Sequence, residues 1–120
     1  MTYAKADVDA QLPLPPATFH ILLAVAQEDR HGYAIILDVE TRTDGALRLS
    51  PGTLYRSIQR MLEQGLLLET DDRPAPEQDD ERRRYYRITP FGAAVARAET
   101  RRMMSLVSMA RVQGLAPGRP

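Results

Sequence analysis

Three side chains that can bind nucleic acid lie close together at Arg56, Gln59 and Arg60. Arg56 and Arg60 are one helical turn apart, so in a helix they share a face from which a guanidinium reaches a phosphate or the O6 and N7 atoms of guanine. Gln59 lies beside them and can pair with adenine. An ordinary solvated helix face carries the same residue types, so this cluster alone does not decide the function.

The residues just before this cluster also suit contact with DNA. Gly52 and Thr53 would lie at the start of the same helix, where small side chains permit close approach and free backbone N–H groups attract a phosphate. Tyr55 projects sideways, so it either donates its hydroxyl to DNA or completes the core. The predicted DNA-binding face therefore comprises Gly52, Thr53, Tyr55, Arg56, Gln59 and Arg60.

A second basic cluster favours the nucleic-acid interpretation. Arg82, Arg83 and Arg84 begin a predicted strand, where the wing of a DNA-binding domain would touch the sugar-phosphate backbone. Successive side chains of a strand point to opposite sides, so these three arginines cannot all reach one base pair. They suit contact with the continuous sugar-phosphate backbone of DNA. Two alternatives are ion pairs with the acids at 79–81 and protection of an exposed sheet edge.

The pattern of caps, turns and apolar residues predicts the elements that hold these residues. Ser50-Pro51 and Thr89-Pro90 each supply a hydroxyl N-cap and a proline at the first helical position, and Gly65 and Gly114 mark helix ends. His31, at the start of the second helix, is expected to provide a polar cap or a hydrogen bond rather than to act in catalysis or as a ligand. We expect helices over 15–29, 33–42, 51–64 and 90–113, a short extended stretch at 47–49, and strands over 66–69 and 83–88.

This order predicts a mainly α fold with a small β-hairpin, a winged helix-turn-helix plus a long C-terminal helix. The expected division is a flexible N-terminal arm at 1–14, a DNA-binding domain at 15–89, a dimerisation helix at 90–114 and a disordered tail at 115–120. In this layout a three-helix core presents its third helix to a DNA groove, and the hairpin lies beside that helix.

The last helix is too long for a core of this size. About 23 residues at 1.5 Å each give roughly 34 Å, and its second half is apolar over more than one stripe. Exposure of that surface would leave a large apolar patch, so we expect a second copy of the chain to cover it. The alternative is a helix that folds back wholly onto its own core. The predicted dimer interface comprises Phe19, Leu22, Met103, Leu106, Val107 and Ala110.

Charge is segregated along a chain whose total is zero. Sixteen basic and sixteen acidic residues cancel. Residues 48–62 hold three arginines and no acid, whereas 71–81 hold six acids. A neutral total can therefore hide a locally basic surface, which is what phosphates at short range respond to.

Other classes of protein are poorly supported. The chain has no Cys and only two His, His20 and His31, so no metal or cofactor is implied. It has no glycine-rich phosphate loop, G-x-S-x-G elbow or H-E-x-x-H motif, and we do not expect an enzyme. No apolar run approaches the roughly 20 residues of a membrane span, and no signal peptide is evident, so we expect a cytoplasmic protein.

Four ordered motifs resemble the successive signatures of PadR-family transcriptional regulators. They are His31-Gly32-Tyr33-Ala34-Ile35, Leu49-Ser50-Pro51-Gly52-Thr53-Leu54-Tyr55-Arg56, Gln64-Gly65-Leu66-Leu67 and the segment from Arg83 to Gly92. The resemblance spans about residues 15 to 114 and is closest to the short branch, which dimerises through one C-terminal helix. It implies a repressor that binds a pseudo-palindromic double-stranded operator as a homodimer and is often released by a small-molecule effector.

Other functions remain open for the same architecture. A winged-helix module can bind protein or RNA, and a ligand sensor or scaffold can lack DNA binding altogether. Salt-sensitive binding to duplex DNA separates these alternatives, because phosphate neutralisation makes the affinity depend steeply on salt concentration.

Overall fold

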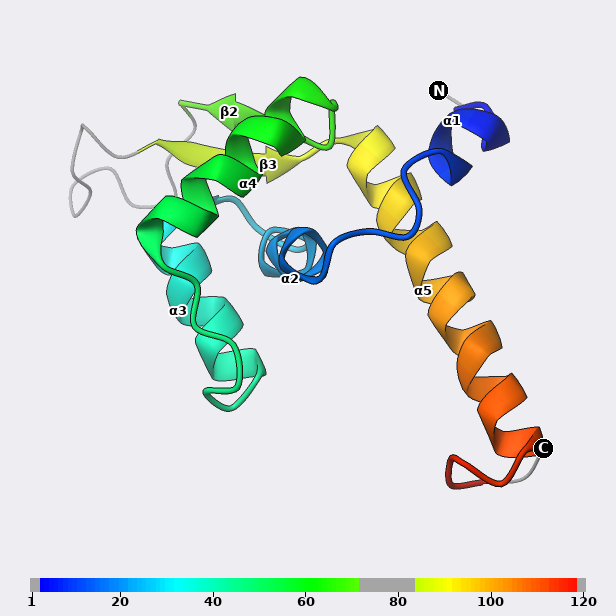
Figure 1. The fold of residues 1–120 in the computed structure, drawn as a ribbon. Coiled ribbons are helices and arrows are strands. Elements are labelled where there is room, and N and C mark those ends of the chain that lie inside the picture. The colour runs from blue at the N-terminus through cyan, green and yellow to red at the C-terminus, as the bar shows by residue number, and fades with distance from the viewer. Residues whose placement is uncertain (1–2, 72–83, 119–120) are drawn as a thin grey trace.

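The fold of the chain, given by a computed structural model, is a helical body with a small sheet on top and a long projecting helix (Figure 1). The structure describes residues 3–71 and 84–118. The predicted mainly α winged helix-turn-helix with a long C-terminal helix is confirmed. The elements are α1 (Lys5–Asp9), α2 (Pro16–Ala24), β1 (Arg30–His31), α3 (Gly32–Arg42), α4 (Pro51–Glu63), β2 (Leu67–Thr70), β3 (Tyr85–Ile88) and α5 (Pro90–Val112).

Three helices begin at the predicted caps. The Ser50 hydroxyl accepts a hydrogen bond from the Thr53 backbone N–H at 3.2 Å, and the Thr89 hydroxyl accepts one from Gly92 at 2.8 Å. His31 caps α3, because its Nδ1 accepts from the Ala34 N–H at 3.2 Å. Each cap satisfies an N–H group that has no partner inside the first helical turn.

Two helices also end where glycine was expected to end them. Gly65 follows α4 and Gly114 follows α5, and both have a φ of +75°. This left-handed conformation has no steric cost for glycine and lets the chain leave the helix sharply. The ends of the third and last predicted helices are therefore confirmed to within a residue or two.

The first predicted helix is too long, and the extended stretch predicted at 47–49 is not part of the sheet. Helix α2 ends at Ala24 rather than at 29, and Arg30 Nε donates a 2.6 Å hydrogen bond to the Ala24 carbonyl. The chain then forms β1 at Arg30–His31. The stretch 47–49 is not a strand, because the Leu47 N–H is bound by the Thr43 hydroxyl at 3.0 Å instead of by another strand.

Strand β3 lies at the centre of a three-stranded antiparallel sheet with the order β1-β3-β2. Arg30 pairs with Tyr86 across one edge, and Leu68 pairs with Arg87 across the other. The Arg87 guanidinium also binds both carboxylate oxygens of Asp29, with Nε–Oδ1 at 3.1 Å and Nη2–Oδ2 at 2.8 Å. The sheet is thereby fixed to the loop that follows α2.

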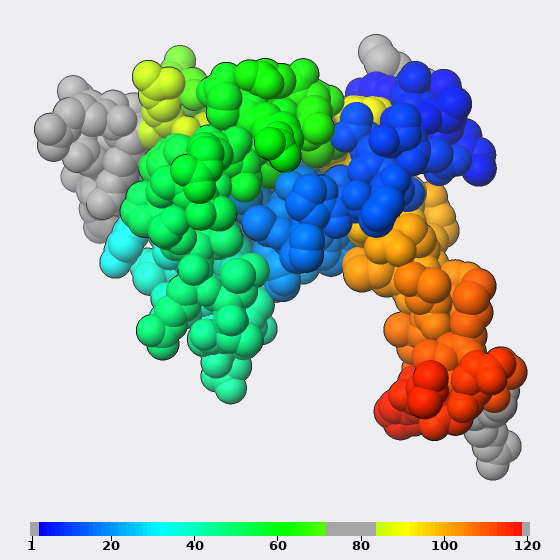
Figure 2. Space-filling model, in the orientation of Figure 1, coloured from blue at the N-terminus to red at the C-terminus, as the bar shows by residue number. Residues whose placement is uncertain are grey.

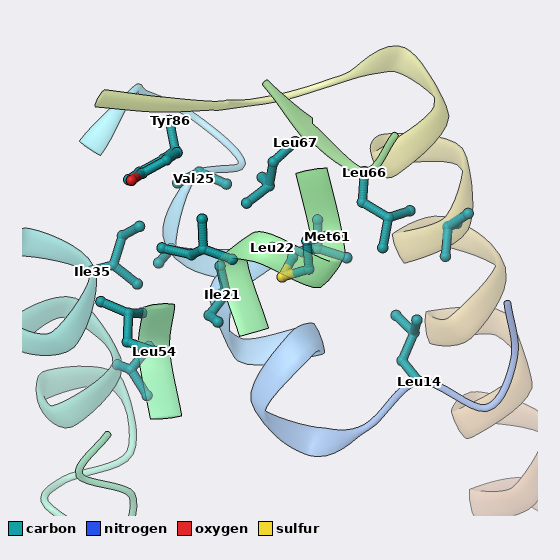
Figure 3. Close-up of a cluster of buried hydrophobic side chains, with 14 of the residues drawn as sticks. Leu14, Ile21, Leu22, Val25, Ile35, Leu54, Met61, Leu66, Leu67 and Tyr86 are labelled. Carbon is teal, nitrogen blue, oxygen red and sulfur yellow. The ribbon is translucent and has the colours of Figure 1, made fainter. Parts of the chain in front are cut away.

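The core lies around α2, which is packed on several sides (Figure 3). Its Ile21, Leu22 and Val25 lie between Leu54 of α4 and Leu67 of β2. Leu22 is only 1% exposed. Its assignment to the dimer interface was therefore wrong, because α2 packs against α3, α4 and α5 of the same chain and Leu22 lies inside that packing.

Part of the segment expected to be a loose arm is ordered. Residues 5–9 form α1, which packs against α5, and Val8 and Leu14 are buried. The Leu14 N–H donates a 2.7 Å hydrogen bond to Oε2 of Glu99, and Arg102 donates to Oε1 of the same carboxylate. Glu99 is 2% exposed. The Arg102 hydrogen bond is the largest cause that lowers the pKa of Glu99, and the Leu14 N–H adds to it, against the opposing effect of burial.

Helix α5 starts in close contact with the end of α4. The Thr89 hydroxyl donates to the Gly65 carbonyl at 2.6 Å, and the Thr89 N–H donates to the Leu66 carbonyl at 3.2 Å. A Cβ on Gly92 would overlap the Leu66 carbonyl oxygen and lie 3.0 Å from its carbonyl carbon. Only glycine permits this approach of α5 to the backbone of the turn that joins α4 to β2.

The second half of α5 leaves the body of the chain (Figure 2). Gly92, Val95, Ala98 and Glu99 are buried, whereas most residues from Thr100 onward are exposed. The alternative in which this helix folds back wholly onto its own core is therefore wrong. Beyond the helix, Arg111 Nε donates a 2.7 Å hydrogen bond to the Pro117 carbonyl, so the beginning of the tail has a defined contact.

Candidate nucleic-acid interface

Helix α4 has one buried face and one exposed face. Leu54, Ile58 and Met61 are buried in the core. On the opposite side, Thr53 is half-buried and the other predicted residues are exposed, namely Gly52, Tyr55, Arg56, Gln59 and Arg60. The structure thus brings the predicted α4 residues together on one accessible surface, the outer face of α4.

The two arginines of the outer face are available to bind an anion. In the part of the chain that the structure describes, no carboxylate lies within ion-pair distance of Arg56 or Arg60. A Cβ on Gly52 would lie 3.7 Å from Nη1 of Arg56, so this guanidinium lies over the first turn of α4. The positive charge and the N-terminal N–H groups of the helix act in the same place.

Gln59 is held in one orientation. Its Nε2 donates a 3.2 Å hydrogen bond to Oε1 of Glu63, one turn further along the exposed surface. The amide is therefore directed along the helix rather than free to rotate. An adenine would have to replace Glu63 as a partner of this amide group.

Tyr55 packs against the start of α3, a contact that reasoning from the sequence missed. A Cβ on Gly32 would lie 2.8 Å from Cζ of the Tyr55 ring and closer still to its hydroxyl oxygen. Tyr55 is also 49% exposed. The ring therefore fixes α4 against α3 and still reaches the surface. The signal in the sequence was the pairing of a glycine after the His31 cap with a tyrosine on the next helix.

The wing is described in part. Arg84 is exposed at the start of β3, and its Nη1 lies 3.2 Å from Oε1 of Glu69 on β2. Arg82 and Arg83 lie outside the described residues. Arg87, which the sequence also places in this basic cluster, is bound to Asp29. Burial raises the pKa of the neighbouring Tyr86, and the charge of Glu69 raises it further, so this phenol stays neutral.

The predicted self-association residues of α5 form a separate surface, the distal α5 surface of Met103, Leu106, Val107 and Ala110. Leu106 is 49% exposed, Val107 is also exposed, and Met103 and Ala110 are half-buried. Figure 2 shows this half of α5 standing clear of the body, with a hollow between them. Phe19 on α2 is half-buried and packs at the edge of the core.

None of the helices in the described ranges combines the length and apolar character that crossing a bilayer requires.

Comparison with solved structures places the fold among winged-helix regulators. A transcriptional regulator from Clostridium thermocellum is 20% identical, with a TM-score of 0.65 over 90% of this chain and 94% of the other. A PadR family transcription regulator from Clostridium difficile is 22% identical, with a TM-score of 0.66 over 80% and 95%. RosR of H. salinarum, in a complex termed RosR-S4, is 21% identical, with a TM-score of 0.66 over 88% and 81%.

Comparison of sequences identifies the family. An uncharacterized protein X of Lysinibacillus sphaericus is 35% identical over 74 residues, which span 62% of this chain and 65% of that protein. The profile of the transcriptional regulator PadR-like family matches residues 21–98, from α2 into α5. Proteins of this family are transcription factors that bind DNA. The chain belongs to the PadR-like family of transcriptional regulators.

Proposed function

We propose that this chain is a sequence-specific transcriptional regulator that reads a double-stranded DNA operator with the outer face of α4. The observation that carries the proposal is the pair of guanidinium groups, Arg56 and Arg60, that face solvent without a carboxylate partner among the described residues. The opposite side of the same helix is fixed in the core. A DNA phosphate or guanine can therefore bind these groups without displacing a protein anion.

The members of this face have different proposed roles. Arg56 lies over the first turn of α4, so with Gly52 and Thr53 it is suited to a phosphate. Arg60 and Gln59 lie a turn further along the helix and are suited to base edges, where a guanidinium pairs with guanine and an amide with adenine. Tyr55 positions α4 through its packing on Gly32, and the exposed part of this residue faces the same side as the proposed DNA contacts.

The wing adds affinity without much sequence preference. Arg84, with its neighbours Arg82 and Arg83, is proposed to bind the sugar-phosphate backbone beside the groove. Arg84 must exchange Glu69 for a phosphate to do so, and an exposed ion pair of this kind costs only about 0 to 1 kcal/mol to break.

The DNA-binding form is proposed to be a homodimer. The distal α5 surface exposes apolar side chains that the described part of the chain leaves uncovered, and a second copy would bury them. Phe19 at the edge of α2 is proposed to contribute, whereas Leu22 is in the core. Two copies of α4 then face two half-sites of a pseudo-palindromic operator.

The direction of regulation follows the resemblance of the four motifs to the family. We propose that the protein acts in the cytoplasm as a repressor and that a small-molecule effector releases it from DNA. The assignments of residues 15–89 to DNA binding and of residues 90–114 to dimerisation also stay predictions.

Fluorescence anisotropy with labelled duplex DNA from upstream of the chain's own gene tests the proposal. Arg56→Ala and Arg60→Ala should each weaken operator binding, by about 1 to 3 kcal/mol where a bidentate base contact is lost. Arg42→Ala removes the same charge from an exposed ion pair with Asp38 and should leave affinity unchanged. Circular dichroism should show that all variants stay folded.

The dependence of affinity on salt completes the experiment. Log affinity should fall with log salt by about 0.9 for each phosphate neutralised. Loss of Arg84 together with Arg82 and Arg83 should flatten that slope and weaken random duplexes as much as the operator. If wild-type protein binds no duplex in a salt-dependent way, the DNA-binding role fails and a protein-binding module or ligand sensor takes its place.

A further inference from the structure

A groove runs between α1 and the first half of α5. Figure 1 shows that these two elements lie on the opposite side of α2 from α3. Its volume is about 620 Å³, within the roughly 300 to 1,000 Å³ typical of small-molecule sites. The α5 side is a shallow floor of Ala93, Ala94 and Ala98, and Val8 of α1 forms part of the opposite wall. This lining suits a hydrocarbon body.

The charged groups of the groove are unbalanced. Lys5 and Asp9 of α1 neutralise each other through a 3.0 Å ion pair. Arg97 and Arg101 line the α5 side one helical turn apart, and no carboxylate of the described residues lies within ion-pair distance of either. The apolar floor is therefore flanked by two guanidinium groups whose charge is uncompensated.

We propose that this groove binds a small organic carboxylate with a hydrocarbon body. The carboxylate accepts charge-assisted hydrogen bonds from Arg97 and Arg101, and the hydrocarbon lies over the alanine floor against Val8. A neutral hydrocarbon would leave the two guanidinium groups without an anionic partner. An inorganic anion would leave the apolar alanine floor exposed to water. Both parts of the ligand are needed to match the lining.

The groove stays open in the proposed dimer. At about 100° per residue, Arg101 lies a third of a turn or more around α5 from all four residues of the distal α5 surface, and Arg97 does so from all of them except Val107. A second copy on the distal α5 surface therefore covers the opposite side of the helix.

The groove also adjoins the contact that holds the N-terminal segment. Ala98 and Arg101 flank Glu99, whose carboxylate binds the Leu14 N–H. A ligand between α1 and α5 therefore reinforces the attachment of the segment at 5–14. Binding itself does not depend on DNA recognition; an effect of the ligand on operator affinity rests on the proposed function.

Isothermal titration calorimetry of the full chain with sodium octanoate, without DNA, tests the site. We expect saturable binding of one octanoate per chain, and binding of 1-octanol and of inorganic phosphate weaker by about tenfold or more. Arg97→Gln combined with Arg101→Gln should weaken octanoate by about tenfold or more while leaving 1-octanol unchanged. Ala93→Phe fills the groove and should abolish octanoate binding with both arginines in place.

The control combines Arg42→Gln with Arg111→Gln, which removes the same charge away from the groove and should keep wild-type octanoate affinity. The proposal is overturned if octanoate binds no more tightly than 1-octanol or phosphate, or if the Arg97 and Arg101 variant or Ala93→Phe binds it like wild type. If the protein binds octanoate but no duplex DNA, this site stands and the proposed function fails. If it binds duplex DNA but not octanoate, the proposed function stands and this site fails.

Discussion

The two halves of α5 are both rich in apolar residues but have opposite surroundings. The first half, which includes Gly92, Val95 and Glu99, is covered by α1, α2 and the turn at Leu66. The second half carries Leu106, Val107 and Met109 into solvent. Apolar composition therefore indicates which residues need to be buried. Whether residues of the same chain or of another chain bury them depends on the fold. Substitutions in the first half should act on the protomer itself, and substitutions in the second half on its assembly.

The largest effect on the protomer is expected from Gly92→Ala. The new Cβ must push α5 away from the Leu66 carbonyl, and overpacking of this kind costs up to about 3 kcal/mol in the free energy of unfolding. Gly52→Ala is the matched control, because its Cβ has room and alanine favours a helix. Urea unfolding followed by circular dichroism measures both. If the two variants are equally stable, the close approach of α5 to Leu66 at Gly92 does not limit the stability of the protomer.

A smaller effect is expected from Glu99→Gln. The substitution keeps the shape of the side chain but removes the charge that Arg102 and the Leu14 N–H bind, and hydrogen bonds to a charged group are worth about 1.5 to 3 kcal/mol. Glu63→Gln makes the same chemical change on the exposed surface of α4 and should shift stability by less than about 0.5 kcal/mol.

The effect of Glu99 should also depend on pH. Its pKa in the folded chain is below its ordinary value of 4.5, so its contribution is present above that value and is lost as the pH falls through the lower folded pKa. The stability difference between wild type and Glu99→Gln should be constant above pH 4.5 and shrink below it. A difference that stays the same from about pH 6 to about pH 3 would contradict this role.

In the second half, Leu106→Glu should leave the protomer folded and abolish self-association. Leu106 is exposed in the protomer, so the change in its own unfolding free energy should be within about 0.5 kcal/mol. The Tm of the wild type should rise with protein concentration, because assembly stabilises the folded chain, and that of the variant should not. Sedimentation should give about twice 13.5 kDa for the wild type. If the wild type stays monomeric at high concentration, the proposed homodimer is wrong.

The smallest effect is expected from Val112→Gln. Val112 is 63% exposed, more than Leu106, but at about 100° per residue it points a third of a turn or more away from every residue of the distal α5 surface. Both the unfolding free energy and the self-association constant should stay close to wild type. A monomeric Val112→Gln variant would show that the interface lies on another side of α5 than the distal α5 surface.

Elements with local signals could be predicted from the sequence. Ser50, Pro51 and Gly65 mark the two ends of α4 through interactions inside a few residues, and apolar spacing then separates its buried face from its exposed face. The positions of Arg56 and Arg60 on the exposed side followed from that spacing.

Elements that depend on distant partners could not be predicted. Helix α1 has five residues and is held by α5, and β1 has two residues and exists through its pairing with β3. The burial of Leu22 needed the packing of several helices, and the Tyr55 contact needed the space above Gly32. Each of these features is set by residues far away in the chain, which periodicity does not reveal.

The close contact between the start of α5 and the turn after α4 links the orientations of the two helices. Thr89 donates hydrogen bonds to the backbone of Gly65 and Leu66, and Gly92 packs against Leu66, so we expect a tilt of α5 to carry the end of α4 with it. A tilt of about 5° at Gly92 displaces Val112, about 30 Å along the helix, by about 3 Å. In the proposed dimer, a small tilt of α5 at Gly92 therefore changes the distance between the two α4 helices. That distance must match half-sites about 34 Å apart.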